Sequence, residues 1–175
     1  MKKIIAVLLA FSAAILMSGC SESYQSDFLH PQAAMQPQTR FLIVTPEIGR
    51  YGDIDYPTSG VDVLTALIKE LKIYSQSITT ITIPVTIENI RDEDLQNYDY
   101  VFIPEILHWE DRATEWSFRP DRIEVRFDIY NNQREMVNSY LITGRGAYVE
   151  WSRKQPKSLL RKPIRDMLET FFGGK

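Results

Sequence analysis

The sequence contains few of the residues that form disulfides, metal sites and nucleophilic active sites. Its 175 residues include one cysteine, Cys20, and two histidines, His30 and His108. A lone cysteine forms no disulfide within the chain, so the fold must be stabilised by packing alone. With a single histidine outside the N-terminal region, no metal site is predicted, and no cofactor. The glycines match neither a phosphate loop nor a dinucleotide fingerprint.

An excess of positive charge is also missing. The chain carries 20 Lys and Arg against 23 Asp and Glu, a net charge of −3. Residues 1–19 hold two of the basic residues and no acidic one, so their removal would lower the net charge to −5. A mildly acidic protein is not a general binder of nucleic acid or of anionic membranes. Nucleic acid is therefore not an expected partner.

Long hydrophobic runs are absent except at the N-terminus, where Ile4–Met17 is almost wholly apolar. A membrane-spanning helix needs about 20 apolar residues, and this run is shorter. Two lysines precede it, and two small residues lead from it into Cys20. The pattern is that of an export signal, and its end resembles the lipobox of bacterial lipoproteins. We therefore predict a lipoprotein signal peptide over 1–19 and a membrane anchor of acyl chains on Cys20.

The residue after the cysteine, Ser21, bears on location. By resemblance to enterobacterial lipoproteins, the absence of Asp at this place favours the outer membrane over the inner. The mature protein is then expected to face the periplasm.

Residues 20–39 are polar and rich in Ser and Gln, and they lack an apolar period. Such a composition predicts a flexible tether between the lipid anchor and the domain. The alternative is that some apolar side chains of this segment dock on the domain. These side chains are Tyr24, Phe28, Leu29 and Met35.

Residues 40–175 are predicted to form one globular domain of the α/β (α+β) class. We expect a mixed sheet of about five strands with two main helices, in the order β-α-β-(α)-β-β-β-α. Short apolar runs predict buried strands, and apolar residues at helical spacing predict a helix. The first elements are a strand at Arg40–Thr45, a helix at Ser59–Tyr74, a strand at Ile78–Ile83, a short helix near Ile87–Leu95 and a strand at Tyr100–Pro104.

Asp121–Tyr130 alternates apolar and charged side chains, which predicts a strand covered on one face only. Asn131 and Asn132 mark a hairpin turn, and the return strand runs to Thr143. An amphipathic helix at Ser158–Phe172 closes the chain. The expected apolar positions are Met136, Tyr140 and Ile142 on the return strand, and Leu159, Leu160, Ile164, Met167, Leu168 and Phe171 on the helix.

The densest group of polar and aromatic residues lies at 108–122, between two predicted strands. Loops on a rigid sheet commonly carry function, and Trp and Arg dominate binding hot spots. One hypothesis is a structural connection clamped by pairs between arginines and carboxylates. Another is a surface that binds a ligand or an envelope protein. The binding candidates are His108, Trp109, Glu110, Asp111, Arg112, Glu115, Trp116 and Arg119.

A third hypothesis is a hydrolase acting on cell-wall glycan or peptide. It would use His108 or paired carboxylates from Glu110, Asp111 and Glu115 as acid and base. No nucleophile with an orienting partner accompanies these residues, so no catalytic residue is predicted. The expected function is that of a non-enzymatic binding or scaffold module with a possible protein partner in the envelope.

Several motifs together resemble a family of bacterial lipoproteins defined only as a domain of unknown function. The resemblance spans Arg40–Phe172 and implies no activity and no catalytic residue. The order of elements is also similar to the amino-terminal domain of the Tol–Pal translocation protein, an analogy of fold alone. The motifs are G-R-Y-G at Gly49–Gly52, Y-P-T-S-G at Tyr56–Gly60, H-W-E-D-R-A-T-E-W-S at His108–Ser117 and R-P-D-R at Arg119–Arg122.

Overall fold

The computed structural model describes residues 22–28, 35–36, 39–112, 119–146 and 155–173. In these residues six strands form one mixed sheet in the order β1-β8-β7-β6-β2-β5, and two further strands form a separate hairpin. The strands are β1 (Ser23–Phe28), β2 (Phe41–Val44), β3 (Gly49–Tyr51), β4 (Ile54–Tyr56), β5 (Ile78–Ile81), β6 (Tyr100–Glu110), β7 (Arg122–Asn131) and β8 (Met136–Arg145).

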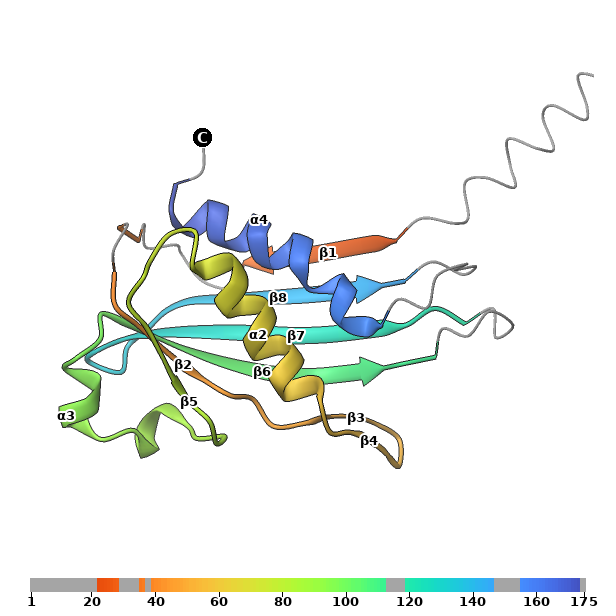
Figure 1. The fold of residues 1–175 in the computed structure, drawn as a ribbon, viewed down its shortest axis with the longest axis horizontal. Helices are drawn as coiled ribbons and strands as arrows, with labels where there is room; N and C mark the ends of the chain where they lie inside the picture. Colours follow the sequence, from red (N-terminus) through yellow and green to blue (C-terminus); the bar gives the residue numbers. More distant parts are fainter. Residues whose placement is uncertain (1–21, 29–34, 37–38, 113–118, 147–154, 174–175) are drawn as a thin grey trace, which may run out of the picture.

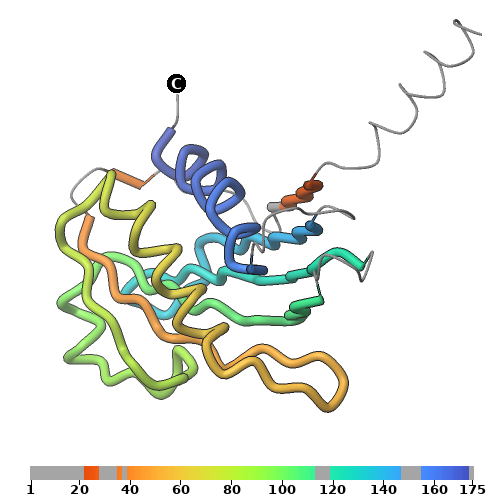
Figure 2. The backbone as a smooth tube through the Cα atoms, turned by 45° about the vertical axis from the view of Figure 1, so that its right-hand side comes forward, coloured from red at the N-terminus to blue at the C-terminus, as the bar shows by residue number. Residues whose placement is uncertain are grey.

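Two main helices, α2 (Ser59–Leu71) and α4 (Arg161–Phe171), lie across the same face of the sheet (Figure 1). Figure 2 shows the β3–β4 hairpin projecting from the body of the domain. The expected α+β class and order of main elements are confirmed, with one strand more in the main sheet and the additional β3–β4 hairpin. None of the described helices has the length and apolar character needed to cross a membrane. The minor helices are α3 (Asp92–Leu95) and the 3₁₀ turns η1 (Ile87–Asn89) and η2 (Pro156–Leu159).

The strands β5, β2 and β6 are parallel and lie between two hydrophobic clusters. β2 pairs with β5 on one side and with β6 on the other. Phe41 and Ile43 point into the larger cluster with α2 and α4, whereas Leu42 and Val44 join a second cluster beneath η1 and α3. The apolar run of β2 is continuous because both of its faces are covered.

The predicted antiparallel hairpin of β7 and β8 is confirmed. The apolar residues of β7 face the core and its charged residues face away from it, as the alternation predicts. Phe127 lies opposite Tyr140 and Val125 opposite Ile142, all facing the helices. Asn138 is also buried on this face, whereas Met136 is 39% exposed. A register shift after Ile129 explains the difference. One extra residue on β8 lies between Asn138 and Met136, and it turns Met136 away from the core.

The prediction that the third strand ends at Pro104 is wrong, because β6 continues to Glu110. Tyr100 donates its N–H to Arg40 O at 3.3 Å, toward β2. Residues two apart on a strand direct their N–H groups to the same edge, so Pro104 also faces β2. Its missing N–H leaves the pairing with β7 intact, where Pro104 lies opposite Phe127.

The first helix is confirmed. Helical spacing predicts an apolar face of Val61, Leu64, Leu67, Ile68 and Leu71, and all but Val61 belong to the larger cluster. Val61 is 58% exposed, and Val63 is buried in its place. The spacing of Ser59 and Asp62 predicts a cap, but the Ser59 hydroxyl donates to Tyr56 O at 2.6 Å, and Ser59 lies inside the first turn. All six apolar residues expected on the last helix and its approach are buried.

Part of the segment expected to be a tether lies in the sheet. Ser23–Phe28 forms the edge strand β1, antiparallel to β8. Tyr24 packs against the larger cluster, and Met35 is buried and donates its N–H to Phe171 O at 2.7 Å. Tyr24 and Met35 therefore dock on the domain, as the alternative predicts. Tyr24 does so through the pairing of β1 with the edge of β8, and Met35 does so at the end of α4. Of the other two expected docking residues, Phe28 is the last residue of β1, and Leu29 lies outside the described residues, as does Cys20.

Candidate functional site

A register shift in β6 decides how the predicted binding residues are displayed. The pairing of β6 with β7 is displaced between Ile106 and His108. Beyond it, Trp109 faces the core opposite Ile123 and is 3% exposed. A bulge of this kind re-aims the side chains that follow it. His108 and Glu110 therefore lie on the opposite, open face of the sheet. The proposed exposure of Trp109 for binding is wrong, since it belongs to the hydrophobic core.

Four side chains meet at the end of β6, and we call them the Glu110 cluster: Tyr51, His108, Glu110 and Arg112. The buried carboxylate of Glu110 forms an ion pair with Arg112, and His108 Nε2 lies 3.6 Å from Glu110 Oε2. The Arg112 guanidinium stands over the Tyr51 ring, 4.3 Å from its centroid. The rings of Tyr51 and His108 meet edge to face at 5.2 Å. The cluster ties the β3–β4 hairpin to β6.

The two ends of the connection between β6 and β7 are held together by Asp121. The backbone N–H of Arg112 donates to Asp121 Oδ1 at 2.7 Å. The backbone carbonyl of Asp121 also accepts a hydrogen bond from the Gly146 N–H at 2.9 Å. Asp121 is buried, so these bonds satisfy a group that would otherwise be costly. The hypothesis of a connection clamped by pairs between arginines and carboxylates is supported at Arg112, whose side chain pairs with Glu110.

Tyr51 is not among the binding candidates, although it lies in the G-R-Y-G motif together with Gly49, the glycine that places it. A Cβ atom on Gly49 would lie 2.5 Å from Trp109 Cβ and 2.8 Å from Ile106 Cγ2. Glycine is therefore needed for β3 to approach β6 so closely. The G-R-Y-G motif and the His-Trp-Glu motif belong to one site because this glycine lets their two strands touch.

The structure places two of the remaining candidates at the surface. Asp111 and Arg119 are exposed at the two described ends of the connection. Glu115 and Trp116 lie outside the described residues. The structure therefore brings together three of the eight candidates, and it adds Tyr51 and Asp121.

A groove of about 400 Å³ crosses the open face of β1, β8, β7 and β6 next to the Glu110 cluster. Arg122 and Arg145 lie directly opposite each other across β7 and β8. In the next row Glu124 lies opposite His108 on β6. On β6, Glu110 lies opposite Arg122, so the first row places one carboxylate beside the two arginines. We call this feature the Arg122–Arg145 groove.

The chemistry of this end of the sheet favours recognition. Glu110 is shielded from solvent and faces Arg112, so it is poorly placed to act as a general acid or base on a substrate. Within the described ranges, no group of three or more His, Cys, Asp or Glu side chains is arranged to hold a metal ion. Paired arginines, in contrast, suit carboxylate or phosphate groups.

Solved structures with the same fold include two of PelC from Paraburkholderia phytofirmans, both dodecamers. The first aligns with a TM-score of 0.63 at 14% identity, covering 86% of this chain and 97% of that one. The second, of a variant with one substitution, has a TM-score of 0.59 with the same identity and coverage. Protein XCC0632 from Xanthomonas campestris, of the DUF330 family, has a TM-score of 0.53 at 11% identity, covering 83% of this chain and 90% of that one.

No curated protein matches the sequence significantly. Residues 33–171 match a family defined as a domain of unknown function, DUF4823. This range holds both the Glu110 cluster and the Arg122–Arg145 pair. The chain belongs to the DUF4823 family.

Proposed function

We propose that this protein is a non-enzymatic binding and scaffold lipoprotein of the cell envelope. Acyl chains on Cys20 hold it at the periplasmic side of the outer membrane. The domain then presents the open face of its sheet to a partner. The short signal core that ends in a cysteine supports the anchor, and a sheet with one uncovered face supports the binding role.

The observation that carries the binding role is the pair of opposed arginines, Arg122 and Arg145. Two guanidinium groups side by side on the open part of the sheet favour an acidic partner, because guanidinium groups bind carboxylates and phosphates with paired hydrogen bonds. The Glu110 cluster stiffens the same end of the sheet, so that the arginines are presented in a fixed geometry. The partner surface we expect carries carboxylate or phosphate groups.

The likeness of the fold to PelC, which forms a dodecamer, supports a scaffold of several copies. Head-to-tail contacts between identical subunits close into rings when the rotation between neighbours allows it. Sedimentation of the lipidated protein in detergent tests this part, and a monomer at all concentrations would remove it.

Cross-linking in intact cells tests the binding role. The lipidated wild type is expected to give a cross-linked envelope protein, and Arg122→Glu is expected to lose it because the charge is reversed. Arg91→Glu is the control, since it reverses an exposed arginine far from the groove, on the turn before α3. A product that forms equally well with Arg122→Glu would show that this face is not the interface.

A further inference from the structure

The two connections that join the parallel strands cross opposite faces of the sheet. The connection from β2 to β5 carries α2 over the face of the larger cluster. The connection from β5 to β6 carries η1 and α3 over the other face. Because β2 lies between β5 and β6, the chain leaves β2 toward one side and returns on the other. Open α/β sheets bind ligands at such a switch point, in the crevice outside the carboxyl ends of the strands.

Pro104 opens this crevice. The pairing of β2 with β6 ends at Ile43 and Phe102, and the next position on that edge is Pro104, which has no N–H to continue it. After β2 the chain follows the other neighbour, since Thr45 donates its N–H to Ile81 O at 2.9 Å. β2 and β6 therefore part at their carboxyl ends.

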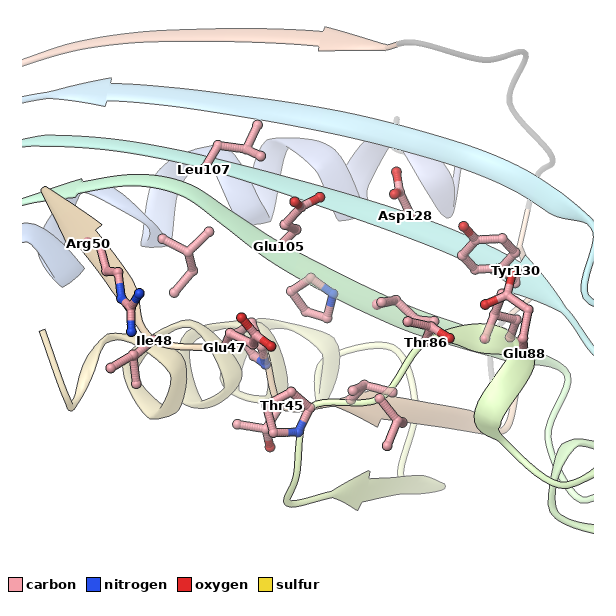
Figure 3. Close-up of a pocket in the computed structure, with 18 residues that line it drawn as sticks. Thr45, Glu47, Ile48, Arg50, Thr86, Glu88, Glu105, Leu107, Asp128 and Tyr130 are labelled. Carbon is pink, nitrogen blue, oxygen red and sulfur yellow. The ribbon is translucent and has the colours of Figure 1, made fainter. Parts of the chain in front are cut away.

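A groove of about 620 Å³ occupies the crevice (Figure 3). Its floor is the face of β6 and β7 that lies opposite to α2 and α4. Its walls are the segments that follow β2 and β5. The volume lies in the usual range of small-molecule sites. Apolar side chains contribute much of the lining, among them Ile48, Val85, Ile103, Leu107 and Tyr130. Ile48 and Leu107 are 38% and 42% exposed, which is unusual for side chains of this size.

The charged side chains that line the groove leave a negative balance, because four carboxylates face one cation, Arg50, which is itself paired with Asp55. On the floor, Glu105 and Asp128 both pair with Arg126. In the walls stand Glu47 and Glu88, and the Arg134 guanidinium, which pairs with Asp92, also acts on Glu88. A hydrogen bond from the Thr86 hydroxyl and one from its own backbone N–H lower the pKa of Glu88, which keeps this carboxylate charged.

We propose that this groove binds a small organic cation, an amine or guanidinium group carried on an apolar body. Figure 3 shows Glu47 and Glu88 at different ends of the groove, so the cation would lie along the groove in the field of both carboxylates, and the apolar body would lie on Ile103 and Leu107. An extended peptide fits less well, because it would bind by adding a strand to the free edge of β6. Pro104 offers no donor to such a strand. The groove is separate from the Arg122–Arg145 groove and has the opposite charge.

Titration of the ¹⁵N-labelled domain with n-octylamine tests the proposal. The amide signals of residues 45, 47–48, 85–88, 103 and 105–107 are expected to shift in a saturable manner. Octanoate and octanol have the same chain without the cation, and both are expected to bind much more weakly. Absence of saturable binding at millimolar amine, equal binding of octanol, or shifts centred elsewhere would overturn the proposal.

Charge variants give the second arm of the test. The double substitution Glu47→Gln and Glu88→Gln is expected to raise the Kd for octylamine about tenfold, as loss of two exposed charge interactions predicts. Both side chains lie at the surface, so the fold should be retained. Glu93→Gln with Glu169→Gln removes the same charge on α3 and α4 and should leave the Kd unchanged. Equal affinity of the two double variants would overturn the role of Glu47 and Glu88.

Discussion

At the scale of single residues, the buried carboxylate of Glu110 depends on Arg112. The guanidinium both neutralises it and covers the Tyr51 ring. A buried ion pair adds little net stability compared with an apolar pair, but loss of one partner strands the other charge. The cluster therefore makes the end of β6 sensitive to a single change.

Arg112→Ala is expected to lower the free energy of unfolding by about 2–3 kcal/mol, because Glu110 stays buried without its cation. For a domain of this size the melting temperature would fall by roughly 5–10 °C. Circular dichroism on heating measures the change. Arg91→Ala, whose ion pairs are exposed, is the control and should melt close to the wild type. Equal melting of the two variants would contradict the clamp.

Trp109 is the residue whose role changes most in the structure. Its side chain packs between Gly49 of β3 and the core of the sheet. Trp109→Ala is expected to lower the free energy of unfolding by about 3–5 kcal/mol, measured by urea denaturation with circular dichroism. Trp109→Phe should lose clearly less, since it keeps most of the apolar volume. A nearly neutral Trp109→Ala would restore the idea of a surface binding residue.

At the scale of elements, α2 and α4 are joined by one buried carboxylate. Glu70 accepts hydrogen bonds from Arg161 at 3.1 Å and from Arg165 at 3.0 Å. Burial raises the pKa of Glu70, but the hydrogen bonds from Arg165 and Arg161 outweigh it, and the pKa lies below its ordinary value. The ionised carboxylate thus links two helices that are far apart in the sequence.

This link predicts a pH dependence. Because the pKa of Glu70 is lower in the folded state, its contribution is present above the ordinary value of about 4.3 and is lost as the pH falls below it. Glu70→Gln is expected to cost about 2 kcal/mol at pH 7 and much less at pH 3, measured by urea denaturation at both pH values. A cost that is equal at the two pH values would show that packing, not charge, joins the helices. Glu93→Gln, on α3, is the matched control.

At the scale of the whole molecule, the proposed lipid anchor on Cys20 would decide where the two grooves can act. Cys20→Ala is expected to leave an unprocessed precursor and to abolish labelling with an alkyne palmitate, since no other cysteine is present. Ser21→Ala keeps the cysteine and should be labelled normally. Normal maturation of the Cys20→Ala protein would end the lipoprotein proposal.

The anchor also constrains the assembly. β1 begins at Ser23, close in sequence to Cys20, and it pairs with β8 at one edge of the sheet. Few residues therefore separate the proposed acyl chains from the folded domain, and the sheet is held near the bilayer surface. A free tether of twenty residues would instead have let the domain reach far from the membrane.

The sequence by itself determined the elements whose patterns are local and strong. The alternation in β7, the apolar run of β2 and the apolar stripe of α4 each depend on burial of residues at one fixed spacing. These patterns give the fold class and the element order, because a stripe or a run can be buried in few ways. The same local patterns indicated that the connection after β6 is clamped.

Only the tertiary structure decided the length of β6, the burial of Trp109 and the place of β1. Each depends on a partner that is distant in the sequence. β2 separates from β6 where Pro104 lacks a donor, and Gly49 leaves room for Trp109. Ser23–Phe28 pairs with the edge of β8. The groove at the switch point has the same origin, since it exists where β2 and β6 part. Pairing between remote strands is set by the summed packing of the domain, so no local spacing in the chain reports it.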